Sequence, residues 1–470
     1  MRKTAAAASL ALVLSGAAQA QTNEQLKHAL DQALKSIDEL KGRVQQLESE
    51  RDKAKAAPPS AAGAPAAAAG AAGAAAPTPA PVQWGAPVVS AATRADDATT
   101  PDADKARLEI YGQVMLDTIY DLKRMNPQWN ATERPSQIPV VCPGSPGCGQ
   151  DGAWIFSARQ SSLGLRSFIP TSFGLVKTDL SFDLFGSDGS TSIHWLNIWA
   201  ELGMFGVGQS YSNFMDIDVF PNTIDYWGPS GMVFVRNPQL RVTPWSKDGM
   251  SVALALEAPN SAIDTGKITE VAPEFGGGFT GWNRLPDLTA SWRVDRDWGH
   301  VKAAGVLRQV GYQNTLTPDG NPSGHKTGYG LNLTGTLKVL GKDQLNGGFV
   351  WGKAIASYMN DGGVDLAPGP ISLGSTSAET VQSIGWLAYY NHVWAENWTS
   401  TIGFSQHTQD NTAGQAATAF RRGSYGNVNV LYTPWKNVLT GLEFVWGELE
   451  QKDGQSATDY RLQFSTKVTF

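Results

Sequence analysis

Residues Asp459 to Phe470 read D-Y-R-L-Q-F-S-T-K-V-T-F, and this stretch decides the class of fold. Its even positions, from Tyr460 to Phe470, are apolar or aromatic apart from Thr466, whereas all its odd positions are polar. Alternation with period 2 predicts a β-strand that has one face in an apolar medium and one face in water. Two interpretations remain open from these residues alone: the last strand of a soluble β-sandwich, or a strand of a closed membrane barrel, which leaves no edge exposed.

The N-terminal residues favour the membrane barrel because they resemble an export signal. Met1-Arg2-Lys3 is basic, Ala5 to Leu14 is apolar, and Ala18-Gln19-Ala20 fits the small-residue cleavage pattern. We therefore expect residues 1–20 to be a signal peptide. No later stretch offers about 18 consecutive apolar residues, which excludes a membrane protein built from helices.

The composition also favours an all-β protein. The chain of 470 residues holds 50 Gly and 16 Trp, a content that suits a large β structure with many turns. Its formal net charge of −6, with only 37 Lys and Arg, argues against a nucleic-acid partner.

Two cysteines, Cys142 and Cys148, are separated by the turn-rich residues P-G-S-P-G. In an exported protein this arrangement predicts a disulfide that closes a small loop. So short a ring contributes about 2 kcal/mol, which braces the loop and not the fold. Binding of a metal by two cysteines without a neighbouring histidine is the weaker interpretation.

Residues 21–55 have a heptad repeat of apolar side chains. Leu30, Ile37 and Val44 take the a positions, and Leu26, Ala33, Leu40 and Leu47 take the d positions. This predicts a periplasmic coiled coil in preference to an isolated surface helix, and the repeat leaves a dimer or a trimer open. Residues 56–107, which are rich in Ala and Pro, are expected to form a linker.

Residues 108–470 contain sixteen candidate strands, several with the same one-sided alternation as the last. They start near Leu108, Trp154, Ser172, Ser192, Met204, Met232, Met250, Asp287, His300, Lys326, Leu345, Thr380, Trp398, Ala419, Val438 and Tyr460. The strand near Met204 is the weakest, because Gly206 and Gly208 interrupt it. No strand is apolar on both faces, as the centre of a large sandwich would require.

The connections between these strands alternate in length. Short ones such as 341–343 and 395–398 alternate with long ones such as 122–152 and 258–283. This rhythm is typical of outer-membrane barrels, and the Trp residues at the short turns are expected to form the periplasmic aromatic girdle. We therefore predict an all-β fold: a transmembrane antiparallel β-barrel of about 16 strands, preceded by an α-helical coiled coil.

The segment Gly203 to Gly231 is too long for a turn and too apolar to extend into water. We predict that it folds into the lumen and narrows it; the alternative is an extracellular loop packed on itself. Folding inward would bring its polar and acidic side chains near the pore: Tyr211, Asp216, Asp218, Asp225 and Tyr226.

Strand parity predicts a set of cations that face the lumen. They are Arg166, Lys177, Arg293, Arg308, Arg421, Arg461 and Lys467. Arg236 and Arg241 flank Pro238 with opposite parity, and a bulge at the proline would turn both inward. Rings of Arg and Lys favour anions, and Arg binds carboxylates in a bidentate way. For any one of these residues, a rim position or a structural salt bridge is the competing interpretation.

Residues 108–470 resemble the DcaP-like outer-membrane porin family. The resemblance rests on Gly208–Gly231, G-Q-S-Y-S-N-F-M-D-I-D-V-F-P-N-T-I-D-Y-W-G-P-S-G, and on Val235–Val242, V-R-N-P-Q-L-R-V. A coiled coil before an Ala/Pro linker is also similar to that family. The resemblance implies a homotrimer of sixteen-stranded barrels that takes up small anions, dicarboxylates in particular. The Cys142–Cys148 loop departs from the family pattern.

These observations predict a porin for passive diffusion of small anionic solutes, with outer-membrane lipid around it and the N-terminal segment in the periplasm. Tyr460 and Phe470 are expected to act as the assembly signal. We find no G-x-S-x-G, H-E-x-x-H or phosphate-binding loop, and expect no enzymatic activity, cofactor or metal. The alternative is a structural tether, with little conductance, that links the outer membrane to the cell wall through the coiled coil.

Overall fold

The computed structural model of the chain describes residues 35, 105–142, 148–264, 279–314, 323–369 and 378–470. The chain divides into two units, Met1–Pro79 and Ala80–Phe470. Of the first unit only Lys35 is described, as a helical and exposed residue. The predicted signal peptide (1–20), coiled coil (21–55) and most of the linker (56–107) therefore lie outside the described residues and stay predictions.

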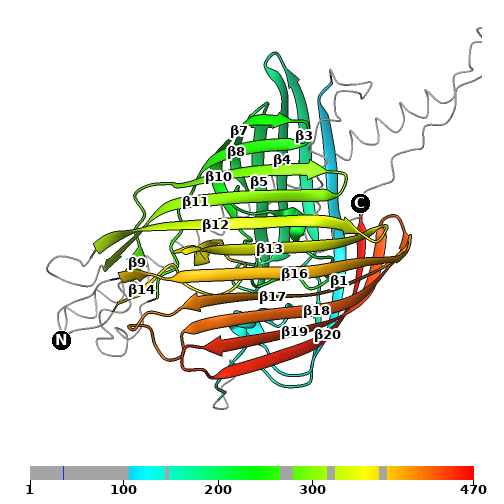
Figure 1. Ribbon diagram of the computed structural model, residues 1–470. Coiled ribbons are helices and arrows are strands. Elements are labelled where there is room, and N and C mark those ends of the chain that lie inside the picture. Colours follow the sequence, from blue (N-terminus) through cyan, green and yellow to red (C-terminus); the bar gives the residue numbers. More distant parts are fainter. Residues whose placement is uncertain (1–34, 36–104, 143–147, 265–278, 315–322, 370–377) are drawn as a thin grey trace, which may run out of the picture. The chain divides into compact units, whose positions relative to one another are not determined.

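The second unit is one large antiparallel sheet, whose hairpins can be followed in Figure 1. Its long strands are β1 (Arg107–Asp121), β3 (Ser162–Thr171), β4 (Gly174–Phe185), β5 (Thr191–Leu202), β6 (Phe205–Tyr211), β7 (Arg236–Lys247), β8 (Met250–Glu257), β10 (Asp287–Arg296), β11 (Gly299–Asn314), β12 (Ser323–Val339), β13 (Asp343–Lys353), β16 (Gln382–Ala395), β17 (Trp398–Asp410), β18 (Phe420–Trp435), β19 (Val438–Gln451) and β20 (Ser456–Thr469).

Four shorter strands are also present among the described residues. β2 (Ala153–Ser157) pairs with β1 and leads into β3, and β9 (Phe279–Gly281) pairs with β11 and precedes β10. β14 (Leu366–Pro368) and β15 (Ala378–Thr380) form a separate two-stranded sheet. With β2 and β9 taken as extensions, the described sheet has sixteen long strands, as predicted.

The sheet closes on itself. Gln113–Asp121 of β1 pair with Arg461–Thr469 of β20, and Gly112 exchanges two backbone hydrogen bonds with Phe470. Closure satisfies the backbone groups of both edge strands, which a lipid environment requires. The predicted closed, antiparallel β-barrel is therefore confirmed.

The two faces of the sheet differ as the alternation of β20 predicts. Leu462 is 40% and Phe464 is 50% exposed, whereas Arg461, Gln463 and Ser465 are fully buried on the other face. Exposed apolar side chains on the outside and polar ones inside are the arrangement that lipid and a hydrated lumen favour. Among the described residues, no helix has the length and apolar character needed to cross a membrane.

The connections are short at one end of the barrel and mostly long at the other. The first group includes 172–173, 203–204 and 340–342, and exposed Trp245, Trp298 and Trp435 lie at such turns. At the opposite end, 186–190 and 452–455 are also short, so the predicted alternation of lengths is not strict. The end with the long connections is called the mouth below.

The strand predicted to be weak, β6, does form, and its glycines have identifiable roles. A side chain at Gly206 would collide with the Trp199 ring, and Gly208 has φ of +115°, which favours glycine. The strand predicted near Met232 begins only at Arg236, because residues 212–235 leave the barrel wall.

Candidate functional site

The connection from β6 to β7, residues 212–235, packs against the inner wall of the barrel; it is called the inner loop below. Its apolar side chains, Phe214, Met215, Val219, Phe220, Met232 and Val233, are buried. They form one cluster with inward-facing residues of β11, β13 and β16, namely Ala304, Val306, Val350, Leu387 and Tyr389. Burial of this apolar face fixes the inner loop to one side of the lumen.

Two buried glutamates of the wall hold the inner loop at its start and near its middle. Glu257 of β8 accepts hydrogen bonds from the Ser212 hydroxyl at 2.9 Å and the Asn213 backbone N–H at 2.9 Å. Glu443 of β19 accepts bonds from the Thr223 hydroxyl and from the backbone N–H groups of Ile224 and Asp225, both at 3.1 Å. A carboxylate satisfied by several loop donors fixes backbone position strongly.

A cavity of about 230 Å³ lies between the inner loop and the wall made by β3 to β7, β10 and β11; it is called the basic cavity below. Five cations line it, Arg166, Lys177, Arg241, Arg293 and Lys302, against three acids, Asp179, Glu201 and Asp216. Aromatic rings of Phe168, Trp199 and Tyr211 complete part of its surface.

Several of these cations are neutralised by ion pairs. Arg166 Nε lies 3.2 Å from Asp179 Oδ2, and the Arg166 guanidinium lies over the Tyr111 ring. Arg293 contacts Asp216 at 3.1 Å and Asp295 at 2.8 Å, and it also pairs with Asp218. These pairs orient the guanidinium groups and reduce their net charge.

Arg241 and Lys302 differ, because neither has a carboxylate at ion-pairing distance in the described part of the chain. Arg241 donates to the backbone oxygen of Tyr211 and to Gln239, and lies 5.3 Å from the centre of the Trp199 ring. Lys302 donates to the backbone oxygen of Met215. Both therefore bring positive charge to the cavity without a directly ion-paired carboxylate, although Asp216 and Glu201 line the same cavity.

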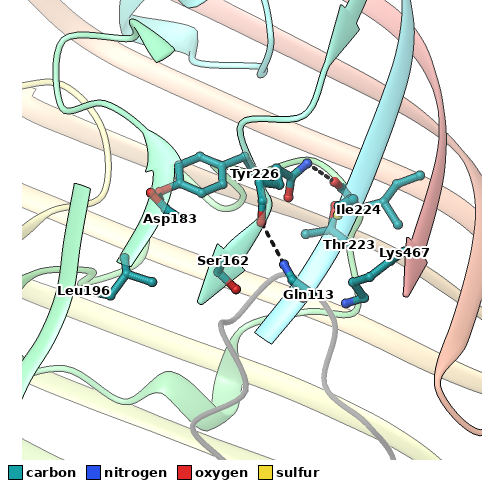
Figure 2. Close-up of a pocket in the computed structure, with 10 residues that line it drawn as sticks. Gln113, Ser162, Asp183, Leu196, Thr223, Ile224, Tyr226 and Lys467 are labelled. Atoms are coloured by element: carbon teal, nitrogen blue, oxygen red, sulfur yellow. Dashed lines mark hydrogen bonds between the residues drawn. The ribbon is translucent and has the colours of Figure 1, made fainter. Parts of the chain in front are cut away.

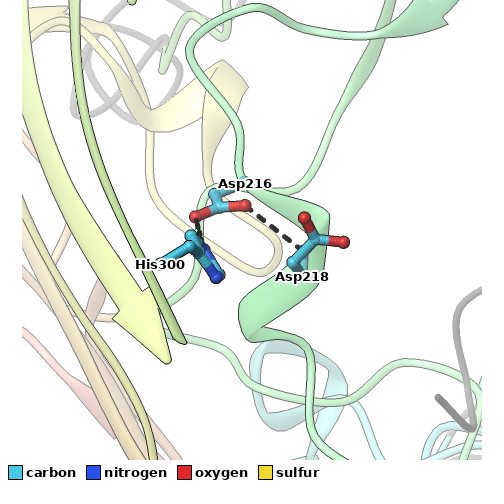
Figure 3. Close-up of side chains that lie close together, drawn as sticks. All are labelled: Asp216, Asp218 and His300. Carbon is cyan, nitrogen blue, oxygen red and sulfur yellow. Dashed lines mark hydrogen bonds and ion pairs between the residues drawn. The ribbon is translucent and has the colours of Figure 1, made fainter. Parts of the chain in front are cut away.

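Asp216 organises one side of the cavity (Figure 3). His300 donates to its carboxylate at 2.8 Å, Thr334 donates at 2.6 Å, and the Asp218 backbone N–H donates at 3.3 Å. Burial opposes ionisation of Asp216, but the hydrogen bond from His300 and the charges of Lys302 and Arg293 hold its pKa well below the ordinary value.

Asp216, Asp218 and His300 are also spaced closely enough to be considered as metal ligands. The donor set does not fit this role, because Arg293 pairs with both carboxylates and Thr334 occupies an Asp216 oxygen. The positive charge that this group needs is already supplied by Arg293. We assign the three side chains to ion pairing.

Most of the predicted pore residues meet at the basic cavity. Of the fourteen side chains expected at the lumen, six line it: Arg166, Lys177, Tyr211, Asp216, Arg241 and Arg293. Two others adjoin it, since Asp218 pairs with Arg293 and Arg236 donates to the Tyr211 hydroxyl at 2.6 Å while its guanidinium lies over that ring.

The prediction of a bulge at Pro238 is wrong. Pairing of β6 with β7 runs without a register shift from Tyr211↔Arg236 to Phe205↔Val242, and the bulge in β7 falls between Val242 and Trp245. Arg241 points into the cavity because side chains alternate regularly between the two faces of β7. Arg236 reaches Tyr211 because it begins β7, where the chain joins the wall from the inner loop.

Arg308 and Arg421 lie away from the cavity. Arg308 is buried and contacts Asp287 at 3.1 Å and Asp365 at 3.4 Å, so it ties a mouth connection to the wall. Arg421 follows a register shift in β18 and pairs with Glu450 at 3.2 Å near the mouth, with about half of its side chain exposed. For both residues the structure favours the salt-bridge interpretation.

Lys467 and Tyr226 line a second, much smaller pocket of about 20 Å³, which has room for a single water (Figure 2). The Tyr226 ring of the inner loop points to Asp183 of β4, and its hydroxyl donates to that carboxylate at 2.7 Å. This contact joins the inner loop to the wall opposite its apolar face. Asp225 lies deeper, where it accepts hydrogen bonds from Thr132 and Tyr425.

Both cysteines are free thiols in the structure. Cys148 is buried and Cys142 is half-buried, and residues 143–147 between them lie outside the described residues. The Cys142–Cys148 disulfide stays a prediction.

The cavity residues missed by the sequence reasoning include three charged side chains and an aromatic one: Asp179, Glu201, Lys302 and Trp199. Lys302 carried a usable signal, because it shares the inward parity of Arg308 on the same strand. Trp199 carried none, since an aromatic residue in an alternating strand is expected to face lipid.

The sequence profile of the family described as "DcaP outer membrane protein" matches residues 88–361, more than half of the chain. The crystal structure of the outer membrane channel DcaP of Acinetobacter baumannii is similar at 22% identity, with a TM-score of 0.65, over 78% of this chain and 97% of that one. The anion-selective porin from Comamonas acidovorans is similar at 9% identity, with a TM-score of 0.50, over 78% and 100%. The comparison with curated proteins found no match.

Proposed function

The chain belongs to the DcaP outer membrane protein family, and from this premise we propose that it is a porin through which small anionic solutes, dicarboxylates among them, diffuse passively. The barrel fold, which it shares with outer-membrane channels, supports a pore. Passive diffusion requires no energy source and no chemical step, so the properties of the lumen wall decide which solutes pass.

The observation that carries the proposal is the pair of cations without carboxylate partners, Arg241 and Lys302. A cation in a confined space that is not tied up in an ion pair attracts anions more strongly than one at an open surface, because less water screens it. Arg241 comes from β7 and Lys302 from β11, so the two offer separate positions to the two carboxylates of a dicarboxylate. The anion selectivity named in the description of the Comamonas acidovorans porin agrees with this proposal.

The position of the inner loop supports the proposal that solutes follow a narrowed path along one wall of the barrel. Its apolar face packs on β11, β13 and β16, and its polar residues Ser212 and Asp216 border the basic cavity. Solutes would therefore pass between the inner loop and the wall of β3 to β7, where Arg166, Lys177 and Arg241 lie. The predicted role of the Gly203–Gly231 segment as a constriction belongs to this proposal.

Assembly is the second part of the proposal. We infer a homotrimer in outer-membrane lipid, with the heptads of residues 21–55 in the periplasm, where they tie barrels together or reach the cell wall. Deletion of residues 21–55 is expected to lower the temperature at which the trimer dissociates in detergent. A trimer of unchanged stability would count against a role of this segment in assembly.

The proposed solute class can be tested by single-channel recording with succinate, a four-carbon dicarboxylate, on one side of a planar bilayer. Succinate is expected to interrupt the chloride current of the wild type briefly as it occupies the basic cavity. In the double variant Arg241→Gln/Lys302→Gln these interruptions should become at least tenfold rarer or briefer, since each charged hydrogen bond contributes about 1.5–3 kcal/mol. Equal interruptions in both proteins would contradict the site.

The same single-channel recording distinguishes the proposed porin function from the alternative of a structural tether. A structural tether with an occluded barrel should show little conductance in the wild type, and release of the inner loop should then be needed to observe any current. Open channels in the wild type exclude this alternative.

A further inference from the structure

Arg461 of β20 is buried among three carboxylates near the mouth of the barrel. Its guanidinium nitrogens lie 3.1 Å from Asp121 Oδ1, 3.1 Å from Glu133 Oε2 and 3.1 Å from Asp459 Oδ2. Asp121 ends β1 and Asp459 belongs to β20, so two of the acids are part of the wall. Glu133 belongs to residues 122–142 of the connection that follows β1, called the mouth segment below.

The cluster holds more negative charge than Arg461 can neutralise. Three carboxylates and one guanidinium give a formal charge of −2, and all four side chains are buried. Within the described residues, Glu133 Oε1 and Asp459 Oδ1 have no hydrogen-bond donor, and Asp121 Oδ1 and Glu133 Oε2 have only their ion pairs with Arg461. Buried ionised oxygens without donors are strongly unfavourable, and binding a proton is the least costly way to remove the charge.

Among the described residues that face Glu133, the surrounding elements supply no second cation. The inner loop brings Asp225, a fourth acid, whose carboxylate accepts bonds from the Thr132 hydroxyl at 3.0 Å and the Glu133 backbone N–H at 2.9 Å. On β19 the carboxylate lies against Gly447, where any side chain would collide with Glu133 Oε1. The charged groups that face Glu133 are therefore Asp121, Asp225, Asp459 and the single cation Arg461.

We propose that this cluster is a proton-operated latch: protons held by Glu133 and its neighbouring carboxylates keep the mouth segment inside the barrel, and loss of these protons releases it. Besides the ion pairs of the cluster, the mouth segment is also held by Arg134 and Ser136, which both donate to Asp361, and by Arg461, which donates to the backbone oxygen of Asn130 at 3.1 Å. Arg124 pairs with Asp151 at 2.8 Å, and Trp129, Ile138 and Phe185 pack in one apolar cluster.

The latch also reaches the inner loop. Thr132 and Glu133 are two of the donors to Asp225, and the Trp227 backbone N–H donates to the Thr132 hydroxyl at 3.0 Å. Release of the mouth segment would withdraw these contacts from the inner loop beside the pore. The latch is therefore placed to couple pH at the cell surface to the shape of the lumen.

The direction of the pH effect follows from the environment of Glu133. Burial raises the pKa of Glu133 well above its ordinary value; Arg461 acts against this shift, and Asp459, Asp121 and Asp225 add to it. A group whose pKa is raised by folding stabilises the folded form at low pH, and this contribution is lost as pH rises through the raised pKa. The mouth segment is therefore held at acidic pH and freed at alkaline pH.

Limited proteolysis of the full-length protein in detergent tests the latch directly. Chymotrypsin cleaves after Trp129, whose side chain is only 6% exposed, so cleavage there reports opening of the mouth segment. Between about pH 6 and pH 9, the wild-type rate, normalised to that of an unstructured peptide, should rise by up to about tenfold per pH unit above the pKa of the cluster. Mass spectrometry identifies the cleavage site.

Glu133→Gln is the decisive variant, because glutamine resembles the protonated side chain. We expect slow, pH-independent cleavage after Trp129 in this variant, while Glu450→Gln on the outer face should behave as the wild type. Asp459→Asn offers the same test if Glu133→Gln fails to assemble.

Two results would overturn the proposal. One is a pH dependence in Glu133→Gln and Asp459→Asn equal to that of the wild type. The other is release of the segment by a chelator at constant pH, which would show that a divalent cation and not protons balances the charge. Because the readout is proteolysis at the mouth, either result leaves the proposed anion pore unaffected.

Discussion

The basic cavity and the Arg461 cluster are two regions of the same inner surface with opposite charge balance. In the cavity five cations face three acids around about 230 Å³ of space, whereas at Arg461 three acids surround one cation and no side chain is exposed. Strand parity places the cations of both regions on the inner face. The difference arises from what covers them: the inner loop leaves the cavity open, while the mouth segment seals Arg461.

The comparison teaches that an inward-facing arginine has one of two roles, set by the loops. An arginine that remains in contact with water keeps a charge available to a passing anion. An arginine sealed among carboxylates stabilises the packing of the segments around it, and its removal leaves buried negative charge. Replacing an arginine should therefore lower mainly the stability of the protein at the Arg461 cluster, and mainly the preference for anions at the basic cavity.

The largest effect is expected from Arg461→Gln. Removing the cation leaves the carboxylates of Asp121, Glu133 and Asp459 without a counter-charge, which should lower the free energy of unfolding by roughly 3–5 kcal/mol at neutral pH. Denaturant titration of the folded barrel, followed by the mobility shift of heated and unheated samples, measures the loss. Arg241→Gln should cost less in the same assay, about 1–2 kcal/mol, because it loses hydrogen bonds to Tyr211 and Gln239 but leaves no buried carboxylate without its counter-charge. Equal losses in the two variants would remove the distinction between the regions.

An intermediate effect is expected from Glu443→Gln, which tests whether the inner loop keeps the cavity narrow. Glutamine cannot accept all the donors that now converge on this carboxylate, and its own N–H₂ group would face them, so local anchoring should weaken by about 1–3 kcal/mol. We expect larger and noisier single-channel conductance with an unchanged barrel. Glu448→Gln, on the outer face of the same strand, serves as the control. Conductance indistinguishable from wild type would mean that the inner loop does not set the width of the path.

The smallest effect is expected from Arg421→Gln. Its ion pair with Glu450 is exposed to solvent, and such pairs contribute less than about 1 kcal/mol. Both stability and the preference for anions should stay within error of the wild type. A clear fall in anion preference would place Arg421 on the path after all and show that the cavity is not the main filter.

Much of the barrel could be predicted from the sequence because alternation is a local property. The parity of β20 correctly assigns Leu462 and Phe464 to the outside and Arg461 and Lys467 to the inside. Parity fails where the chain departs from regular pairing. Arg421 lies beside a register shift in β18, and Arg236 lies where β7 begins.

The charge state of the site could not be predicted, because it depends on segments far apart in the chain. Glu133 reaches Arg461 because closure of the barrel pairs β1 with β20, and Met215 of the inner loop accepts a hydrogen bond from Lys302 of β11. Nothing in the local sequence of β20 shows that its arginine will be covered. The sequence therefore predicts which cations face inward, and the fold decides which of them remain available to a solute.

The central claim is that Arg241 and Lys302, the cavity cations without an ion-paired carboxylate, make the pore select anions, and the reversal potential in a KCl gradient across a planar bilayer tests it most directly. The account predicts a wild-type reversal potential with the sign of chloride preference, which moves toward zero in Arg241→Gln/Lys302→Gln. A wild-type channel that prefers potassium, or a double variant with the same potential as the wild type, would contradict the account.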